Sequence, residues 1–112
     1  MKEYTYIFLI NCYTMNQISV KNLREKKFSM ILDVRSKDEY DRGHIPGAKL
    51  YDMGDIEKWS KKLKKDKEYY LVCKSGVRSG FAYVMLEEMG FEKCYNVVGG
   101  TDAWIEEGYE IE

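Results

Sequence analysis

The chain has 112 residues, a formal net charge of −1 at pH 7, three cysteines and one histidine. This length fits one domain that needs no metal or disulfide to hold its core, and a charge so close to zero argues against a nucleic-acid-binding protein. Three cysteines without a framework spacing argue against a disulfide scaffold, one histidine without a Cys-x-x-Cys pair argues against a zinc site, and no apolar run approaches the roughly 20 residues of a membrane span.

The first predicted element is a strand near the start of the chain. Residues 3–10 are rich in aromatic and β-branched side chains, so we assign residues 1–16 to a first strand. The apolar part of this segment is short for a signal peptide, and no small-residue cleavage site follows it. Because its cysteines are expected to be unpaired thiols, the protein is predicted to be cytoplasmic.

Strands and helices are predicted to alternate along the rest of the chain. Short apolar runs predict strands over residues 28–34, 69–73 and 95–98. Helices are predicted over residues 19–27, 55–65, 81–89 and 101–107, with Thr101 as the last N-cap, and between Ser36 and Gly43, where Ser36 and Glu39 have the spacing of a capping box. This alternation predicts an α/β fold in one domain over residues 1–112, with a central parallel sheet of about five strands and helices on both faces.

The strongest chemical signal follows the predicted strand over residues 69–73. In parallel α/β sheets the active site lies beyond the carboxyl ends of the strands, and Cys73 closes this one. The next helix begins near Ser79, so the intervening loop turns backbone N–H groups toward one point and forms an anion cradle. The helix dipole, Lys74 and Arg78 favour a Cys73 thiolate, which is the nucleophilic form of the side chain. The alternative is a structural cysteine buried at the end of a strand.

A cysteine–histidine protease or acyl transferase is a second interpretation of this cysteine. Such an enzyme needs a base within hydrogen-bonding reach of the thiol. His44 is the one histidine, and it lies in a turn over residues 43–48 (Gly-His-Ile-Pro-Gly-Ala), where a structural role is expected.

The sequence resembles the rhodanese-like sulfurtransferases over roughly residues 17–108. Four segments carry the resemblance, in the order and spacing of the family: Asp33-Val34-Arg35 with Glu39-Tyr40, the turn over residues 43–48, the Cys73 loop through Ser79, and Gly99-Gly100 with Ala103-Trp104. Each segment alone is a weak signal, whereas the four together are specific.

The resemblance implies a rhodanese-like fold and a sulfur-transfer reaction. Cys73 would take a sulfane sulfur from an anionic donor, such as thiosulfate or a persulfide, and pass it to a thiol or cyanide acceptor. The implied catalytic residue is Cys73, with a substrate-binding loop of Lys74, Ser75, Gly76, Val77 and Arg78, and with Asp33, Arg35 and Ser79 in support; neither a metal nor a cofactor is implied. The alternative is a rhodanese-like binding or redox-sensing module with little turnover.

Loop length separates this chemistry from that of related enzymes. The spacing in this chain is Cys-x4-Arg, whereas the related phosphatases and arsenate reductases have Cys-x5-Arg, with one more residue to surround a tetrahedral oxyanion. The shorter loop favours transfer of sulfur over hydrolysis of phosphate esters.

Structural roles are expected for several other residues. Arg35 is expected to form an ion pair with Glu39 or Asp38, because a guanidinium suits fixed carboxylate pairing. Trp104 is expected to anchor the core, and Cys94 is expected to be buried and inert. No feature of the sequence brings Cys12 close to Cys73.

A basic segment over residues 58–67, from Lys58 to Lys67, holds six lysines and one aspartate. One interpretation is a solvated helix face. The other is a docking site for an acidic protein partner. We expect neither a nucleic acid nor a membrane as a partner.

Overall fold

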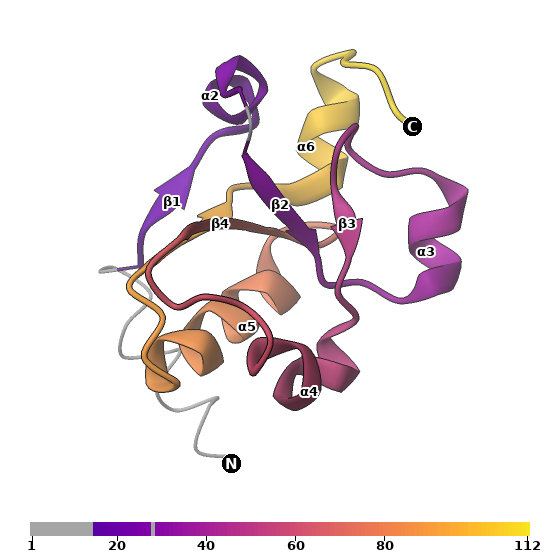
Figure 1. The fold of residues 1–112 in the computed structure, drawn as a ribbon. Helices are drawn as coiled ribbons and strands as arrows, with labels where there is room; N and C mark the ends of the chain where they lie inside the picture. Colours follow the sequence, from indigo (N-terminus) through magenta and orange to yellow (C-terminus); the bar gives the residue numbers. More distant parts are fainter. Residues whose placement is uncertain (1–14, 28) are drawn as a thin grey trace.

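The computed structural model describes residues 15–27 and 29–112, in which a five-stranded parallel sheet lies between two layers of helices (Figure 1). The strands are β1 (Gln17–Ile18), β2 (Met30–Asp33), β3 (Lys49–Leu50), β4 (Glu68–Val72) and β5 (Lys93–Val97), in the order β1-β5-β4-β2-β3. The helices are α2 (Val20–Glu25), α3 (Lys37–Arg42), α4 (Ile56–Ser60), α5 (Val77–Glu88) and α6 (Gly100–Glu106), with a 3-10 turn η1 (Met53–Asp55). Within the described ranges, no helix has the length and the apolar run needed to cross a membrane.

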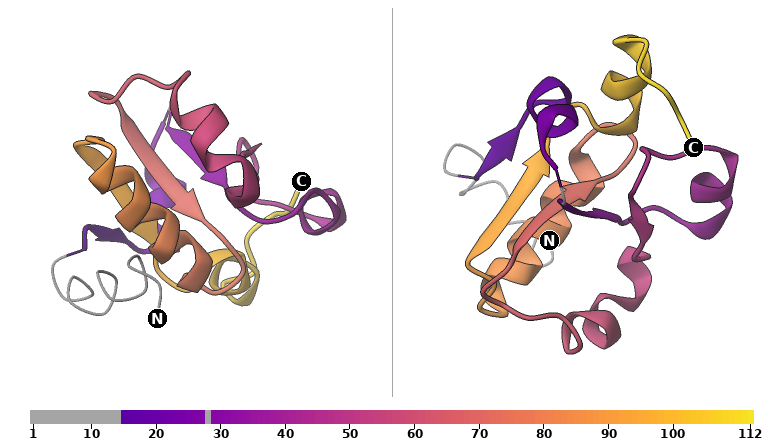
Figure 2. Two further views of the ribbon diagram at one scale, coloured as in Figure 1. Left: turned by 90° about the horizontal axis from the view of Figure 1, so that it is seen from below. Right: turned by 45° about the horizontal axis from the view of Figure 1, so that its top comes forward.

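Both faces of the sheet are covered by buried side chains. In β4, Tyr69 and Leu71 join a core with α4 and α5, whereas Tyr70 and Val72 join a second core with α2 and α6. Successive side chains of a strand point to opposite faces, so a strand covered on both sides is apolar throughout. The views in Figures 1 and 2 show α2 and α6 on one side of the sheet and α4 and α5 on the other. The predicted parallel α/β sheet with helices on both faces is confirmed.

Three of the predicted strands correspond to β2, β4 and β5. The short strands β1 and β3 were not predicted, because two residues are too few to show an alternating or continuous apolar pattern. The strand predicted over residues 3–10 lies outside the described part of the chain.

The capping box predicted at the start of α3 is confirmed. The Glu39 N–H donates to the Ser36 hydroxyl oxygen at 3.3 Å, and the Ser36 N–H donates to Glu39 Oε1, also at 3.3 Å. The helix ends at Arg42 and is capped by Gly43, which has a φ of 147°. This short helix places the Glu39 carboxylate at a fixed point beside the end of the sheet.

The basic helix predicted over residues 55–65 is shorter than predicted, because α4 ends at Ser60. Continuing it would stack Lys58 and Lys62 one turn apart, where like charges repel. The chain instead tightens into a turn in which the Lys62 N–H donates to the Trp59 carbonyl oxygen at 3.1 Å. The lysines that follow therefore lie on a connection to β4 and not on one helix face.

Two helices begin earlier than predicted, each after a glycine with a left-handed backbone. α5 begins at Val77, because Gly76 caps it with a φ of 102°. α6 begins at Gly100, and its N-cap is Gly99, with a φ of 76°, so the prediction of Thr101 as the N-cap is wrong. Glycine adopts such angles without the steric cost that other residues incur. The last two residues of the predicted active loop therefore lie in the first turn of α5.

Candidate active site

Cys73 directly follows β4 at the carboxyl end of the sheet and is only 1% exposed. The Gly76 N–H donates to Cys73 Sγ at 3.1 Å, and the Ser79 hydroxyl donates to the same atom at 3.3 Å. Hydrogen bonds from two donors stabilise sulfur most strongly when it carries negative charge. Cys73 Sγ therefore faces two groups that can stabilise negative charge on sulfur.

The backbone N–H groups of residues 74–78 lie around the position of Cys73 at the start of α5. Among them, the Gly76 N–H donates to Cys73 Sγ itself. The N–H groups of Val77 and Arg78 belong to the first turn of α5, where a helix has no acceptors of its own. The positive end of this 12-residue helix adds to the attraction for negative charge beside Cys73.

Asn96 of the neighbouring strand β5 connects both groups that contact the sulfur. Its amide Nδ2 donates to the Gly76 carbonyl oxygen at 3.0 Å, and its Oδ1 accepts from the Ser79 hydroxyl at 2.5 Å. A serine hydroxyl has one proton, so Cys73 Sγ and Asn96 Oδ1 compete for it. Asn96 is a site residue that was not predicted from the sequence. One signal in the sequence pointed to it: Asn96 is a polar residue within a predicted apolar strand, and a buried amide needs hydrogen-bond partners.

The start of α6 holds the other side of the Cys73 loop. The Thr101 N–H donates to the Cys73 carbonyl oxygen at 2.9 Å, and the Asp102 N–H donates to that of Lys74 at 2.9 Å. A Cβ atom on Gly100, which has a φ of 60°, would overlap the Cys73 carbonyl oxygen. Only glycine allows this close approach, so the Gly-Gly pair lets α6 fix the backbone of the loop.

Both cations of the loop already have carboxylate partners. Arg78 donates to Glu39 through two nitrogens, each 2.8 Å from a carboxylate oxygen, and Lys74 Nζ lies 2.9 Å from Asp102 Oδ2. The hydrogen bonds from Arg78 lower the pKa of Glu39 to about 2, and the same contact raises the pKa of Arg78. The attraction predicted between these cations and an anionic sulfur donor is therefore partly offset by two carboxylates.

Glu39→Gln is expected to lower the free energy of unfolding at neutral pH and to have progressively less effect as the pH falls toward 2. Arg78 holds the pKa of Glu39 at about 2, below its ordinary value of 4.5, so the contribution of the pair is complete above about pH 4.5 and is lost as the pH falls through about 2. Urea unfolding of both proteins from pH 7 to pH 2 checks this, with Glu88→Gln at the exposed end of α5 as the control. If the difference in free energy of unfolding between the original protein and Glu39→Gln stayed constant from pH 7 to pH 2, the prediction would be contradicted.

Arg35 pairs with Asp33, so the predicted ion pair with Glu39 or Asp38 is wrong. Arg35 Nε lies 2.9 Å from Asp33 Oδ1 and Nη2 lies 2.7 Å from Oδ2, while Nη2 also donates to the Gly43 carbonyl oxygen at 2.9 Å. Both side chains of the pair are buried. The guanidinium folds back on the nearest buried carboxylate, because Glu39 is already bound by other groups. The pair ties the end of β2 to the turn after α3.

A hollow of about 300 Å³ lies beside the Cys73 loop and is lined by Arg35, Arg42, Lys74 and Thr101, among others. The Thr101 hydroxyl is buried there, and no other group within the described ranges hydrogen-bonds to it. An orphaned buried hydroxyl is rare, because it costs free energy unless a partner is found.

The contacts of His44 match the structural role predicted for it. Its Nδ1 lies 2.9 Å from the Tyr40 carbonyl oxygen, and its ring stacks on the Tyr40 ring with the centroids 3.7 Å apart. Its Nε2 lies 3.5 Å from a carboxylate oxygen of Glu112. These contacts hold the imidazole between the turn and the last residue of the chain.

Cys94 and Trp104 have the surroundings expected from the sequence. Cys94 is buried in β5, where burial, with a smaller effect of Glu87, raises the pKa of its thiol to about 12. A thiol with that pKa stays protonated and unreactive at neutral pH. Trp104 is buried in the core beneath α6. Cys12 lies outside the described residues.

Comparison with known proteins relates the chain to one family. A family model described as the Rhodanese-like domain matches residues 16–107. The thiosulfate sulfurtransferase GlpE of Coxiella burnetii is 30% identical over 90 residues, which cover 80% of this chain and 84% of that protein. YrkF of Bacillus subtilis, provisionally named a sulfur carrier protein, is 37% identical over 98 residues, which cover 84% of this chain but only 53% of YrkF. The crystal structure of a rhodanese-like domain protein from Staphylococcus aureus matches with a TM-score of 0.75 and 41% identity, covering 88% of this chain and 99% of that one.

Proposed function

Because the chain belongs to the rhodanese-like domain family, we propose that it is a sulfurtransferase that carries a sulfane sulfur on Cys73. The observation that best supports this role is the position of Cys73 Sγ, which faces the Gly76 N–H and the Ser79 hydroxyl at the carboxyl end of β4. Both groups stabilise negative charge on Sγ, which is present before sulfur is taken up and again when the sulfur leaves. The related GlpE is named for thiosulfate, so we take thiosulfate as the first sulfur donor to test.

The first half of the reaction loads the cysteine. The Cys73 thiol loses its proton to solvent, and the thiolate attacks the outer sulfur of thiosulfate. A bond forms between Sγ and that sulfur, the sulfur–sulfur bond of thiosulfate breaks, and sulfite leaves with the electron pair. The enzyme now holds a persulfide, and no external oxidant or reductant is consumed.

The second half of the reaction unloads the cysteine. A thiolate or cyanide attacks the terminal sulfur of the persulfide and forms a bond to it. The bond between that sulfur and Sγ breaks, and Cys73 leaves as the thiolate that the Gly76 N–H and the Ser79 hydroxyl stabilise. The acceptor carries the sulfur away as a persulfide or as thiocyanate.

The loop residues have separate roles in this proposal. Gly76 gives the turn that aims its N–H at the sulfur, and Asn96 holds that turn through the Gly76 carbonyl oxygen. The exposed Lys74 attracts an anionic sulfur donor, although Asp102 offsets part of its charge. Ser75, Val77 and Arg78 complete the substrate-binding loop, and the buried pair of Asp33 and Arg35 supports it from β2.

A thiosulfate:cyanide assay tests the proposed function. The reduced protein should form thiocyanate only when both substrates are present, and Cys94→Ala should leave the rate unchanged because that thiol is buried and protonated. If thiosulfate gives no product, glutathione persulfide is the next sulfur donor. Failure of both would overturn the proposal and favour a binding or redox-sensing module.

Ser79→Ala is expected to slow turnover by about tenfold, because a hydrogen bond to a charged group contributes about 1.5–3 kcal/mol. The variant loses the hydroxyl that lies 3.3 Å from Cys73 Sγ, so the attacking and leaving sulfur has one hydrogen-bond donor fewer. Inactivation by iodoacetamide at pH 7 should slow to a similar extent, which a purely structural role would not cause. Unchanged inactivation, with a lower unfolding midpoint, would assign Ser79 to stability alone.

A further inference from the structure

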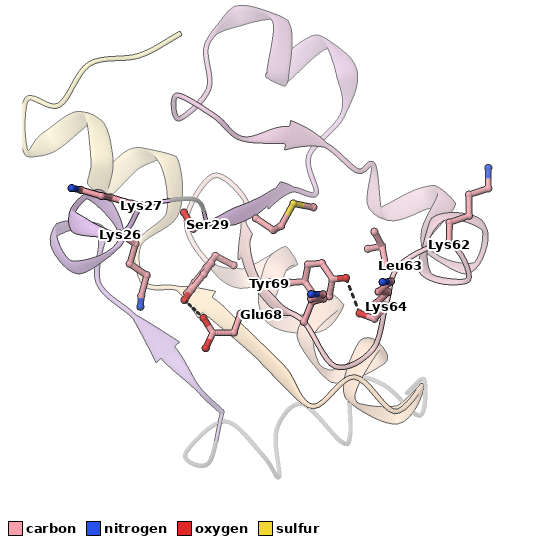
Figure 3. A pocket seen from close by; sticks show the side chains of 11 residues that line it. Lys26, Lys27, Ser29, Lys62, Leu63, Lys64, Glu68 and Tyr69 are labelled. Atoms are coloured by element: carbon pink, nitrogen blue, oxygen red, sulfur yellow. Dashed lines mark hydrogen bonds between the residues drawn. The ribbon is translucent and has the colours of Figure 1, made fainter.

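We infer that a basic groove at the end of the sheet opposite to Cys73 binds an acidic segment of a partner protein. The basic groove has a volume of about 640 Å³, and five lysines line it: Lys26, Lys27, Lys62, Lys64 and Lys67 (Figure 3). All five side chains are exposed. The groove is separate from the Cys73 loop, and nothing in the proposed sulfur-transfer reaction uses it.

Two connections that enter neighbouring strands form the walls of the basic groove. One connection leads from α2 to β2 and carries Lys26 and Lys27, and the other leads from α4 to β4 and carries the remaining three lysines. β2 and β4 are paired in parallel, with Met30 beside Tyr69, so the segments that enter their amino ends lie next to each other. The fold thus brings together lysines that are far apart in the sequence.

This arrangement divides the basic segment over residues 58–67. Lys62, Lys64 and Lys67 line the basic groove, whereas Lys61 and Lys65 line a different hollow. The single basic helix face predicted from the sequence is therefore wrong. The lysines of the groove include two from another part of the chain.

The lysines of the basic groove have no carboxylate partners in the part of the chain that the structure describes. Within residues 15–27 and 29–112, none of its five lysines lies within 4.0 Å of a carboxylate oxygen. Glu68 is the one acidic residue in the lining, and its carboxylate accepts a hydrogen bond from the Tyr70 hydroxyl at 2.9 Å. By contrast, Lys74 and Arg78 near the cysteine each have a carboxylate partner. Such a cluster of cations around one hollow favours a ligand with several negative charges.

The shape and lining of the basic groove favour an acidic polypeptide. Single-stranded nucleic acids bind by stacking bases on exposed aromatic rings, but Tyr69 and Tyr70 in this lining are buried. A membrane surface would need a protruding apolar face, whereas this site is recessed. Met30, which is 37% exposed, offers an apolar contact between the lysines. These features fit an extended segment in which acidic side chains flank an apolar one.

A partner in the basic groove would leave the cysteine uncovered. Glu68 lies at the start of β4 and Cys73 follows its end, so the strand separates the two sites by roughly 16 Å. Occupation of the groove would therefore hold a partner on the protein while sulfur donors and acceptors still reach the loop. Binding at the groove does not depend on sulfur transfer.

Fluorescence anisotropy with a fluorescein-labelled peptide of repeated Glu-Glu-Leu units tests this inference. The groove variant is Lys62→Gln/Lys64→Gln/Lys67→Gln, and the matched control is Lys58→Gln/Lys61→Gln/Lys65→Gln, which removes the same charge from the same segment outside the groove. We expect the groove variant to bind the peptide about tenfold more weakly and the control to stay within about twofold of the original protein. Replacing leucine by serine in the peptide should also weaken binding, because the contact with Met30 is lost.

Two results would overturn the inference. One is equal weakening in the groove and control variants, which would indicate general attraction to a basic surface. The other is a lack of peptide binding together with groove-dependent binding of a uridine oligonucleotide or of phosphatidylglycerol vesicles. Thermal unfolding confirms that both variants are folded, and any thiosulfate:cyanide turnover should stay within about threefold of the original in the groove variant.

Discussion

Cys73→Ser is expected to lower the rate of thiocyanate formation by more than about a thousandfold, because a serine hydroxyl is a far weaker nucleophile than a thiolate and makes a poor leaving group. The substitution changes one atom in a side chain that is 1% exposed, so the fold should persist. Turnover with thiosulfate and cyanide measures the loss, and thermal unfolding shows that the variant is folded.

Cys94→Ala is the matched control for this variant. Cys94 is also a buried cysteine, but its thiol has a pKa raised to about 12 and lies outside the Cys73 loop. Full activity in Cys94→Ala together with none in Cys73→Ser assigns the chemistry to one thiol. Retained activity in Cys73→Ser would contradict the proposed mechanism.

Asp33→Ala is expected to have the largest effect on stability, lowering the free energy of unfolding by about 3–5 kcal/mol. Asp33 is 0% exposed and holds the guanidinium of Arg35, which is 6% exposed. Removing the carboxylate leaves the buried guanidinium of Arg35 without its anionic partner. The resulting loss of folding free energy exceeds the contribution of the ion pair itself, because an unpaired buried charge is strongly destabilising. Urea unfolding at neutral pH measures the change.

The exposed ion pair between Lys37 and Asp41 provides the control for this prediction. Both of its side chains are more than half exposed, so water and salt screen the interaction. Asp41→Ala should leave the unfolding midpoint unchanged within error. If Asp33→Ala has as small an effect, the buried pair does not hold β2 to the turn after α3.

The main features of the fold could be predicted because they depend on local signals. The apolar runs that became β2 and β4 are long enough to identify buried strands, and the capping box at Ser36 lies within four residues. The position of Cys73 at a strand end followed from the same pattern. A parallel sheet then places that end at the edge where sites form.

The remaining features depend on contacts between distant parts of the chain. Asn96 reaches the Cys73 loop only because β5 lies beside β4, and no local pattern shows that neighbour. Glu39 forms its ion pair with Arg78, which is 39 residues later in the sequence, whereas Arg35 forms its ion pair with Asp33. The five lysines of the basic groove are likewise close in space only because β2 pairs with β4. Sequence patterns identify such residues as polar or charged but do not show which of them meet.

Intact mass spectrometry of the reduced protein after incubation with thiosulfate shows whether Cys73 carries sulfur. We expect the protein to gain one sulfur atom, cyanide to remove it with formation of thiocyanate, and Cys73→Ser to gain none. Glutathione persulfide serves as a second sulfur donor. If neither donor adds a sulfur atom, or if Cys73→Ser gains as much as the original protein, Cys73 is not a persulfide carrier.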